Sequence, residues 1–127
     1  MPNTRNNSTQ TRSILVIDDD LVVIKVLEKL LTKAGFIVFT SMTAEQGLSL
    51  ARSEKPDLVL LDVYLPDADG LDVCRKIKND PLLAHTYVII ISGVKIDAHE
   101  RADGLGSGAD GYMTKPLNNR EILAKIE

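Results

Sequence analysis

Two short apolar runs in the chain end directly in carboxylates. SILVI, at residues 13–17, is followed by Asp18, Asp19 and Asp20, and LVLL, at residues 58–61, is followed by Asp62. Apolar runs of this length are typical of strands that are covered on both faces of a parallel sheet. The carboxyl ends of such strands lie at one edge of the sheet, where ligands of open α/β sheets bind. We therefore expect these acids to meet at one rim.

Carboxylates brought together in this way need a compensating group. Adjacent strands lie about 4.8 Å apart, so Asp18 and Asp19 come within about 5 Å of Asp62 if their strands are neighbours. Two like charges at that separation repel by roughly 3 kcal/mol at an effective dielectric constant near 20. Either one acid holds a proton at a raised pKa, or a hard divalent cation lies among them. An oxygen-only site open to solvent suits Mg²⁺, and we favour the metal.

A hydroxyl and an ammonium follow two later apolar runs. Ser92 comes after YVIII, at residues 87–91, and Lys115 comes after GYMT, at residues 111–114. A donor and a cation beside a metal-carboxylate cluster are what a transferring phosphoryl group requires. Neither a histidine nor a reactive cysteine is expected at this rim, so the nucleophile is a carboxylate, which can form an acyl phosphate. Asp62 is the candidate, because it stands alone on the middle strand.

The segments between the apolar runs have helical spacing. Apolar residues recur every three or four positions over 21–34, with Asp20 placed to cap the helix and Gly35 to end it. Thr43 and Gln46 form a capping-box pattern that opens the next helix. The full set of expected elements comprises strands at 13–17, 36–40, 57–61, 87–91 and 111–114, and helices at 21–34, from 43 to before Pro56, around 73–77, at 95–104 and at 118–127.

Strands that alternate with helices in units of about 20 residues predict βαβ crossovers. The expected fold class is α/β, a doubly wound five-stranded parallel sheet with helices on both faces. Its length of 127 residues suits one domain, which we place at 13–127 after a polar, disordered lead-in at 1–12. Helix 95–104 has few apolar anchors and glycines directly after it, so we expect it to be short and loosely held.

Composition excludes several classes of protein. Fifteen Lys plus Arg against 18 Asp plus Glu give a net charge of −3, which favours neither nucleic acid nor an anionic membrane as a partner. No apolar run approaches the roughly 18 residues of a membrane span, and the start of the chain lacks the apolar segment of a secretory signal. One cysteine, Cys74, cannot build a disulfide framework, so we expect a reducing cytoplasm and a buried core thiol.

Four fragments, in order and at these spacings, resemble one family. They are ILVIDDD, LLDVYLPDADG, IIISG and DGYMTKP. Together they make residues 13–127 resemble the receiver domain of two-component response regulators, including the single-domain chemotaxis type. The resemblance implies a flavodoxin-like strand order of 2-1-3-4-5. It also implies that Asp62 accepts the phosphoryl group and that Asp18 and Asp19 hold Mg²⁺, with Asp19 as the direct ligand.

The resemblance implies further roles in the same site. The backbone carbonyl of Tyr64 is a metal ligand, the Ser92 hydroxyl binds the new phosphoryl group, and Lys115 pairs with it. The bond between Lys115 and Pro116 is cis, which proline permits at modest cost. On phosphorylation Ser92 moves toward the phosphoryl group and the switch residue Tyr112 turns inward. The face built from the fourth helix, fifth strand and fifth helix then changes its affinity for partners.

The implied partners are a sensor histidine kinase or histidine phosphotransfer protein as donor and an unknown downstream effector. A phosphorylation-dependent dimer is left open. The protein is then a signalling switch that catalyses its own phosphorylation and dephosphorylation, and not an enzyme with a diffusible substrate. Tyr64 and Val94 stand where the family tunes attack by water, and neither obviously positions one, so we expect slow loss of phosphate. The chain stops where the last helix is expected to continue, which suggests a piece of a longer protein.

Two other functions remain as alternatives. An aspartate-nucleophile phosphatase or hydrolase would need a second acid two residues after Asp62, where the chain has Tyr64. A degenerate, phosphorylation-independent interaction domain is disfavoured by the complete set of site residues. The expected role of Asp20 is only that of a helix cap, and the DADG turn lacks the twelve-residue spacing of a calcium-binding loop.

Overall fold

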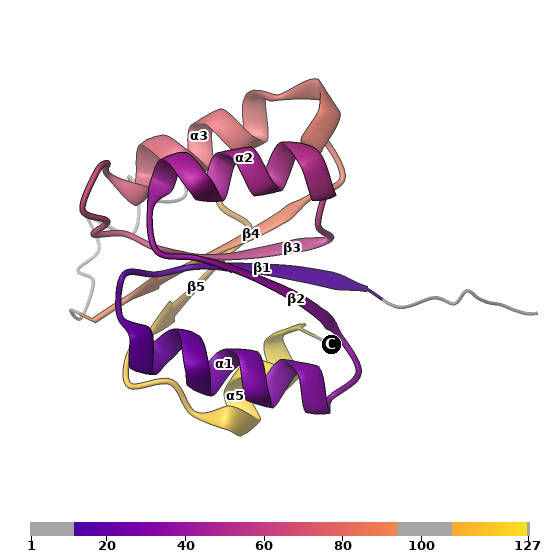
Figure 1. Cartoon of the computed structure of the whole chain (residues 1–127), viewed down its shortest axis with the longest axis vertical. Helices are drawn as coiled ribbons and strands as arrows, with labels where there is room; N and C mark the ends of the chain where they lie inside the picture. Colours follow the sequence, from indigo (N-terminus) through magenta and orange to yellow (C-terminus); the bar gives the residue numbers. More distant parts are fainter. Residues whose placement is uncertain (1–11, 94–107, 127) are drawn as a thin grey trace, which may run out of the picture.

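A computed structural model describes residues 12–93 and 108–126 of the chain. Five parallel strands form one sheet in the order β2-β1-β3-β4-β5, which confirms the predicted fold class and strand order (Figure 1). The strands are β1 (Ser13–Ile17), β2 (Ile37–Ser41), β3 (Leu58–Asp62), β4 (Tyr87–Ser92) and β5 (Gly111–Thr114). The helices are α1 (Leu21–Lys33), α2 (Ala44–Glu54), α3 (Gly70–Asn79) and α5 (Asn119–Ile126), with a short 3₁₀ turn, η1 (Pro81–Leu83).

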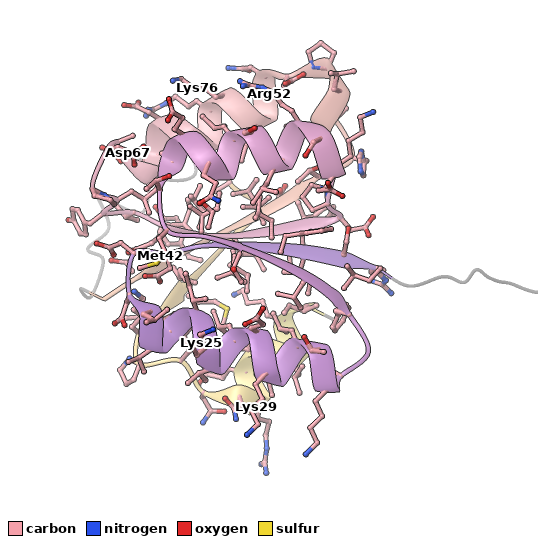
Figure 2. All side chains as sticks on the ribbon, in the orientation of Figure 1. Lys25, Lys29, Met42, Arg52, Asp67 and Lys76 are labelled. Carbon is pink, nitrogen blue, oxygen red and sulfur yellow. The ribbon has the colours of Figure 1, made fainter. Side chains whose placement is uncertain are left out.

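Helices cover both faces of the sheet. Figure 1 shows α2 and α3 on one face and α1 and α5 on the other. Alternate residues of each central strand enter the two cores: Leu15 and Ile17 pack under α2 and α3, whereas Ile14 and Val16 pack against α1. β1, β3 and β4 are therefore buried almost throughout, as their continuous apolar runs predicted. Charged side chains such as Lys29 and Lys76 project outward from both helical layers (Figure 2).

The first helix begins and ends as its sequence predicted. The Asp20 carboxylate accepts a hydrogen bond from Val22 N at 2.9 Å, and Gly35 adopts a φ of 102° just past the helix. A side chain at that φ would be strained, so glycine suits the position. Three of the residues on the buried side of α1, Ile24, Leu27 and Leu31, pack on the sheet.

The predicted capping box at the start of α2 is confirmed for Thr43 but not for Gln46. Thr43 Oγ1 accepts from Gln46 N at 3.2 Å, as expected, but the Gln46 side chain does not reach back to Thr43. It contacts Ser41 Oγ at 3.4 Å, and Thr43 N donates to Ser41 Oγ at 3.2 Å. The hydroxyl at the end of β2 takes the role that the sequence pattern gave to Gln46, because the tight turn places it closer.

Other boundaries shift by one or two residues, and β3 includes Asp62 itself. The predicted helix at 95–104, together with Val94, lies outside the described residues. In the described part of the chain no helix is long and apolar enough to cross a membrane.

Candidate functional site

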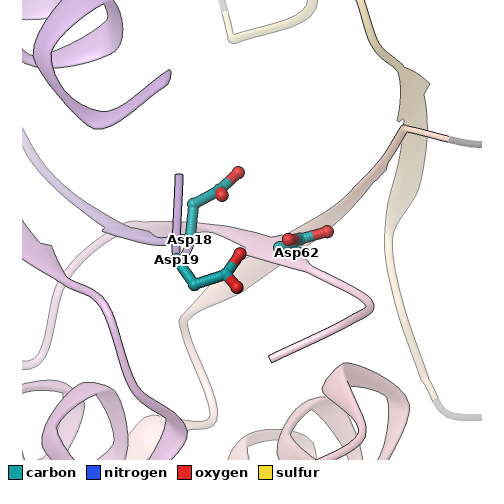
Figure 3. Close-up of side chains that lie close together, drawn as sticks. All are labelled: Asp18, Asp19 and Asp62. Atoms are coloured by element: carbon teal, nitrogen blue, oxygen red, sulfur yellow. The ribbon is translucent and has the colours of Figure 1, made fainter. Parts of the chain in front are cut away.

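Three carboxylates meet at the carboxyl edge of the sheet, as the sequence predicted. Asp18 and Asp19 follow β1, and Asp62 ends the neighbouring strand β3. One oxygen from each lies within 4.8 Å of the others (Figure 3). Asp18 and Asp62 are buried, whereas Asp19 is exposed to solvent. The cluster therefore has two acids on the inside and one at the mouth.

Backbone contacts hold Asp18 in the buried position. Its N–H donates to the carbonyl of Ser41 at 3.0 Å, which extends the pairing of β1 with β2 by one residue. Its Oδ1 accepts from Asp20 N at 2.9 Å, the first amide of the turn into α1. Its Oδ2 forms an ion pair with Lys115 Nζ at 2.8 Å. The buried charge on Asp18 is therefore paired with the Lys115 ammonium.

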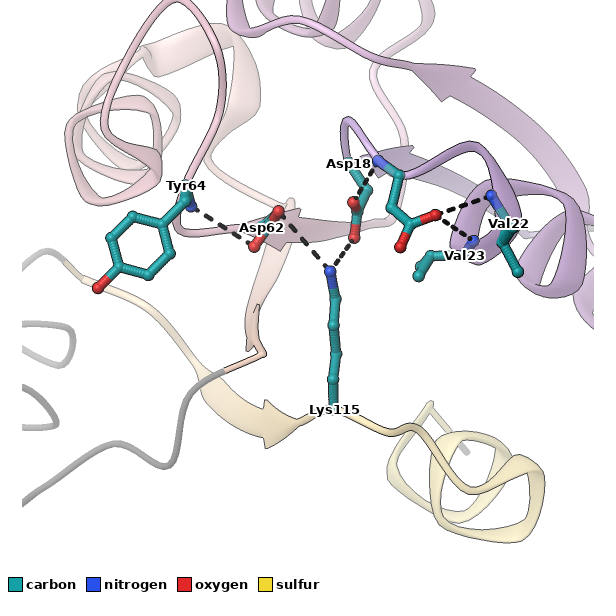
Figure 4. A network of polar contacts seen from close by, with 7 residues as sticks. Asp18, Val22, Val23, Asp62, Tyr64 and Lys115 are labelled. Atoms are coloured by element: carbon teal, nitrogen blue, oxygen red, sulfur yellow. Dashed lines mark hydrogen bonds and ion pairs between the residues drawn. The ribbon is translucent and has the colours of Figure 1, made fainter.

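Lys115 reaches the acids from the end of β5. Its backbone N–H donates to the Ser92 carbonyl at 2.7 Å, and its Nζ lies 3.7 Å from Asp62 Oδ2 (Figure 4). Burial opposes the charged form, but the close contact with Asp18 and the charge of Asp62 outweigh it and raise the pKa of Lys115. The ammonium is thus held in its charged form between two carboxylates. The bond from Lys115 to Pro116 is cis, as expected.

Asp62 is the carboxylate whose charged form its surroundings disfavour. Burial, followed by the negative charge of Asp18, raises the pKa of Asp62, although Lys115 opposes the shift. One oxygen of Asp62 faces the backbone N–H of Tyr64 at 3.5 Å, a weak contact. The sequence analysis offered a raised pKa and a bound cation as alternative remedies. Burial and the neighbouring Asp18 disfavour the charged form of Asp62, so this is also the place where a cation would be stabilising.

The donor set fits a hard divalent cation. All candidate ligands are oxygens, the Lys115 ammonium is the one polar partner of the buried Asp18 Oδ2 among the described residues, and exposed Asp19 leaves a solvent side for bound water. Mg²⁺ prefers such sites, since it binds through one or two carboxylates and keeps several waters.

The structure places the other predicted residues near this edge. Ser92 is buried at the end of β4, beside the strand that carries Asp62. Tyr112 is partly buried on β5 and packs against the core under α2 and α3. The side chain of Tyr64 is 61% exposed, and its ring points away from Lys115 (Figure 4).

Two residues with structural importance at the site were not predicted. Gly70, the first residue of α3, lies so close to the Asp62 carbonyl that any Cβ would overlap it, and its N–H donates to the Val63 carbonyl at 2.6 Å. Asp67, in the loop between β3 and α3, accepts hydrogen bonds from the first amides of α2, which lower its pKa. Both belong to the DADG segment, which the sequence indicated only as a turn.

A shallow apolar groove borders the site. Its volume is about 430 Å³, and its walls come from α1 and from the segment after β5. The lining includes Asp20, Val22, Val26, Lys115, Pro116 and Leu117. Val22 is 69% exposed and Val26 is 50% exposed, so one side of the groove presents apolar surface to solvent.

Comparison with known proteins adds independent information. The family model described as "Response regulator receiver domain" matches residues 14–127. The alkaline phosphatase synthesis transcriptional regulatory protein PhoP of Bacillus subtilis is 37% identical over 91% of this chain and 47% of its own length. The transcriptional regulatory protein AfsQ1 of Streptomyces coelicolor is 41% identical over 90% of this chain and 49% of its own. The chain thus spans about half the length of these relatives.

Solved structures agree with this match. A CheY-like response regulator receiver domain protein from Methanospirillum hungatei superimposes with a TM-score of 0.85 at 31% identity, covering 92% of this chain and 91% of that one. The BeF3-activated DrrB receiver domain gives a TM-score of 0.82 at 34% identity, covering 92% and 95%.

Proposed function

The chain belongs to the family of response regulator receiver domains, and on that premise we propose that Asp62 is the aspartate that takes up the phosphoryl group. One observation carries the assignment: Asp62 is the carboxylate that lies both within 4.8 Å of the acid pair and 3.7 Å from the Lys115 ammonium. Asp18 contacts Lys115 more closely, but it is fully buried, so a donor cannot reach it. Asp62 is also mostly buried, but its 5% exposure leaves a small opening to solvent beside the compensating ammonium.

The proposed reaction transfers a phosphoryl group from a histidine of the donor to Asp62. An oxygen of Asp62 attacks the phosphorus, the new O–P bond forms, and the P–N bond breaks with its electron pair returning to the histidine nitrogen. Later a water attacks the phosphorus, the O–P bond breaks, and phosphate leaves while Asp62 regains its carboxylate. The protein is thus a signalling switch, altered by its own modification.

Each neighbouring residue has a proposed role in that reaction. Asp19, Asp62 and the carbonyl of Tyr64 would hold Mg²⁺ directly and Asp18 mainly through water, and the ion would supply positive charge to the phosphoryl oxygens. Lys115 turns from Asp18 toward the phosphoryl group, because that group brings negative charge to the Asp62 side of the ammonium.

Ser92 and Tyr112 are the proposed switch residues. The Ser92 hydroxyl donates to the new phosphoryl oxygens, and Tyr112 then moves toward the space that Ser92 leaves. Support comes from position: Ser92 and Tyr112 lie on adjacent strands, and Ser92 already accepts a backbone hydrogen bond from Lys115. Through this movement the β5 side of the domain would signal to a downstream effector.

The groove beside α1 is the proposed docking surface for the donor, a sensor histidine kinase or histidine phosphotransfer protein. Its exposed Val22 and Val26 form an apolar surface that continues to Lys115 and Pro116 at the phosphorylation site. A donor seated there presents its histidine to Asp62. A cytoplasmic location, where such donors act and where the buried Cys74 thiol stays reduced, is part of the same proposal.

The test is phosphorylation by a small donor. The native chain incubated with acetyl phosphate and MgCl₂ is expected to gain one phosphoryl group by intact mass, whereas Asp62→Ala gains none. Asp57→Ala, at the other end of the same strand, serves as the matched control and is expected to behave as the native chain. A full mass gain in Asp62→Ala would place the modification elsewhere and contradict the proposal.

Loss of the phosphoryl group is expected to be slow, with a half-life of minutes or longer, because the Tyr64 ring is 61% exposed and its hydroxyl points away from Asp62 and Lys115, so it is not placed to hold a water against the phosphorus. The decay of the phosphorylated mass after removal of acetyl phosphate measures this. A half-life of seconds would contradict the expectation.

A further inference from the structure

Asp67 joins the phosphorylation-site loop to a different helix. It lies in the loop between β3 and α3, five residues past Asp62, and its side chain reaches the start of α2. Its Oδ1 accepts from Ala44 N at 2.8 Å, and its Oδ2 accepts from Glu45 N at 3.0 Å. Both oxygens of one carboxylate thus bind consecutive backbone amides that lie more than 20 positions away in the chain.

These contacts complete the cap of α2. A helix leaves its first four amides without partners inside the helix. In α2, Thr43 N donates to Ser41 Oγ and Gln46 N donates to Thr43 Oγ1. The two amides between them are the ones that Asp67 accepts. A carboxylate at a helix N-terminus is also favoured by the helix dipole, so the contact is a strong one for an exposed side chain.

Backbone contacts hold the loop at its two ends, and Leu65 and Ala68 in its middle pack against the core under α2 and α3. Gly70 N donates to Val63 O at 2.6 Å, and Tyr64 pairs with Asp69 in an isolated antiparallel bridge. These two backbone contacts lie close to β3 and α3, on either side of the middle of the loop. Asp67 lies between Leu65 and Ala68, and its two hydrogen bonds attach this part of the loop to the start of α2.

The start of α2 is in turn attached to the loop that carries the acid pair. Asp18 N donates to Ser41 O at 3.0 Å, and Ser41 Oγ donates to Thr43 O at 2.8 Å. A continuous chain of hydrogen bonds therefore runs from Asp18 through the end of β2 and the cap of α2 to Asp67. It ties together the two loops that must converge on one cation, on the side of the site away from Lys115.

We infer that Asp67 is a positioning residue for the phosphorylation site, which holds the Tyr64 loop at the correct distance from Asp18 and Asp19 by its attachment to α2. The inference rests on the proposed function, since it concerns the same metal and phosphoryl site. Groups that orient metal ligands without touching the metal commonly affect affinity about 10–100-fold. Loss of Asp67 is therefore expected to weaken Mg²⁺ binding about tenfold while the domain stays folded.

Calorimetric titration with MgCl₂ and phosphorylation by acetyl phosphate test this on the full 127-residue chain. The variants are Asp67→Ala, which removes both acceptors, and Asp67→Asn, which keeps one. Asp57→Ala is the matched control, because Asp57 is also exposed and accepts a backbone hydrogen bond, from Ser13 N at 2.9 Å, at the opposite end of β3. Circular dichroism melting shows that each variant is folded at the assay temperature.

The expected result is a graded one. Asp67→Ala needs about tenfold more Mg²⁺ for half-maximal phosphorylation, Asp67→Asn needs an intermediate amount, and Asp57→Ala matches the native chain. At saturating Mg²⁺ the phosphorylation rate of Asp67→Ala recovers most of its native value, which a general loss of folded protein would not allow.

Two outcomes overturn the inference while leaving the proposed function intact: native Mg²⁺ affinity in Asp67→Ala, or an equal loss in Asp67→Ala and Asp57→Ala. If the native chain itself takes up no phosphoryl group, the proposed function is wrong and the inference fails with it.

Discussion

Replacing Asp62 with asparagine is expected to stabilise the metal-free protein, although it removes the proposed phosphorylation site. Asparagine has almost the shape of aspartate, so the substitution mainly deletes a charge. That charge is buried and lies within 4.8 Å of oxygens on Asp18 and Asp19, while Lys115 Nζ lies 3.7 Å away. The pKa of Asp62 is raised by the same burial and the same neighbouring acid.

The size of the effect follows from these distances. At an effective dielectric constant near 20, a negative charge 4.8 Å from Asp62 repels it by about 3.5 kcal/mol. The Lys115 ammonium at 3.7 Å attracts Asp62 by about 4.5 kcal/mol. Repulsion from exposed Asp19 is reduced by solvent, to about half. Repulsion then exceeds attraction by about 1 kcal/mol, and the desolvation of Asp62 adds to it. We expect Asp62→Asn to raise the free energy of unfolding by about 1–3 kcal/mol, which corresponds to a rise of about 4–10 °C in Tm for a domain of this size.

Thermal melts at pH 7 in EDTA and in MgCl₂ measure this. Without metal, Asp62→Asn is expected to melt above the native chain, whereas Asp72→Asn, an exposed control on α3, stays within about 0.5 kcal/mol. Mg²⁺ at ten times its dissociation constant stabilises the native chain by about 1.4 kcal/mol and stabilises Asp62→Asn less. If Asp62→Asn melts at or below the native chain in EDTA, attraction to Lys115 dominates and the reasoning is wrong.

The remaining predictions concern the groups around this cluster. Lys115→Met leaves a buried carboxylate unpaired and is expected to lower the free energy of unfolding by about 3 kcal/mol in urea titrations, with partial recovery in MgCl₂. Gly70→Ala is expected to lower the free energy of unfolding by about 2–4 kcal/mol, because the new Cβ overlaps the backbone of Asp62. Gly35→Ala is the control: its Cβ meets no atom within 4 Å, so only the strain of the positive φ remains, about 1 kcal/mol. Val22→Glu is expected to leave both stability and phosphorylation by acetyl phosphate unchanged while slowing transfer from a phosphohistidine donor; equal rates from both donors would exclude the α1 groove as the docking surface. The lowered pKa of Asp67 means that its contribution to stability is complete above the unfolded pKa and is lost as the pH falls through the lower folded value. Asp67→Asn is therefore expected to be less stable than the native chain at pH 7 and to approach it in acid melts; a difference that is independent of pH would contradict this cause.

Much of the site was predictable from the sequence because it depends on strand order and strand ends. Continuous apolar runs indicate which segments form the buried strands of the sheet, and parallel strands bring their carboxyl ends to one edge. Four site residues each follow such a run: Asp18, Asp62, Ser92 and Lys115. Their convergence at one edge of the sheet can therefore be predicted without knowing the side-chain contacts.

Other features were decided by tertiary structure. Lys115 contacts Asp18 more closely than Asp62, and the side chain of Gln46 contacts Ser41 instead of closing its own cap. Each depends on the distance between groups that the linear spacing does not encode.

The same holds for Asp67 and Gly70, which appeared in the sequence as parts of one polar turn. Their importance comes from what lies opposite: the amides of α2 for the carboxylate, and the carbonyl of Asp62 for the missing side chain. The chain itself determined a sheet with acids at its rim, because hydrophobic periodicity is local. The contacts between loops that hold this rim in shape exist only after the strands have packed, because partners far apart in sequence meet through the fold.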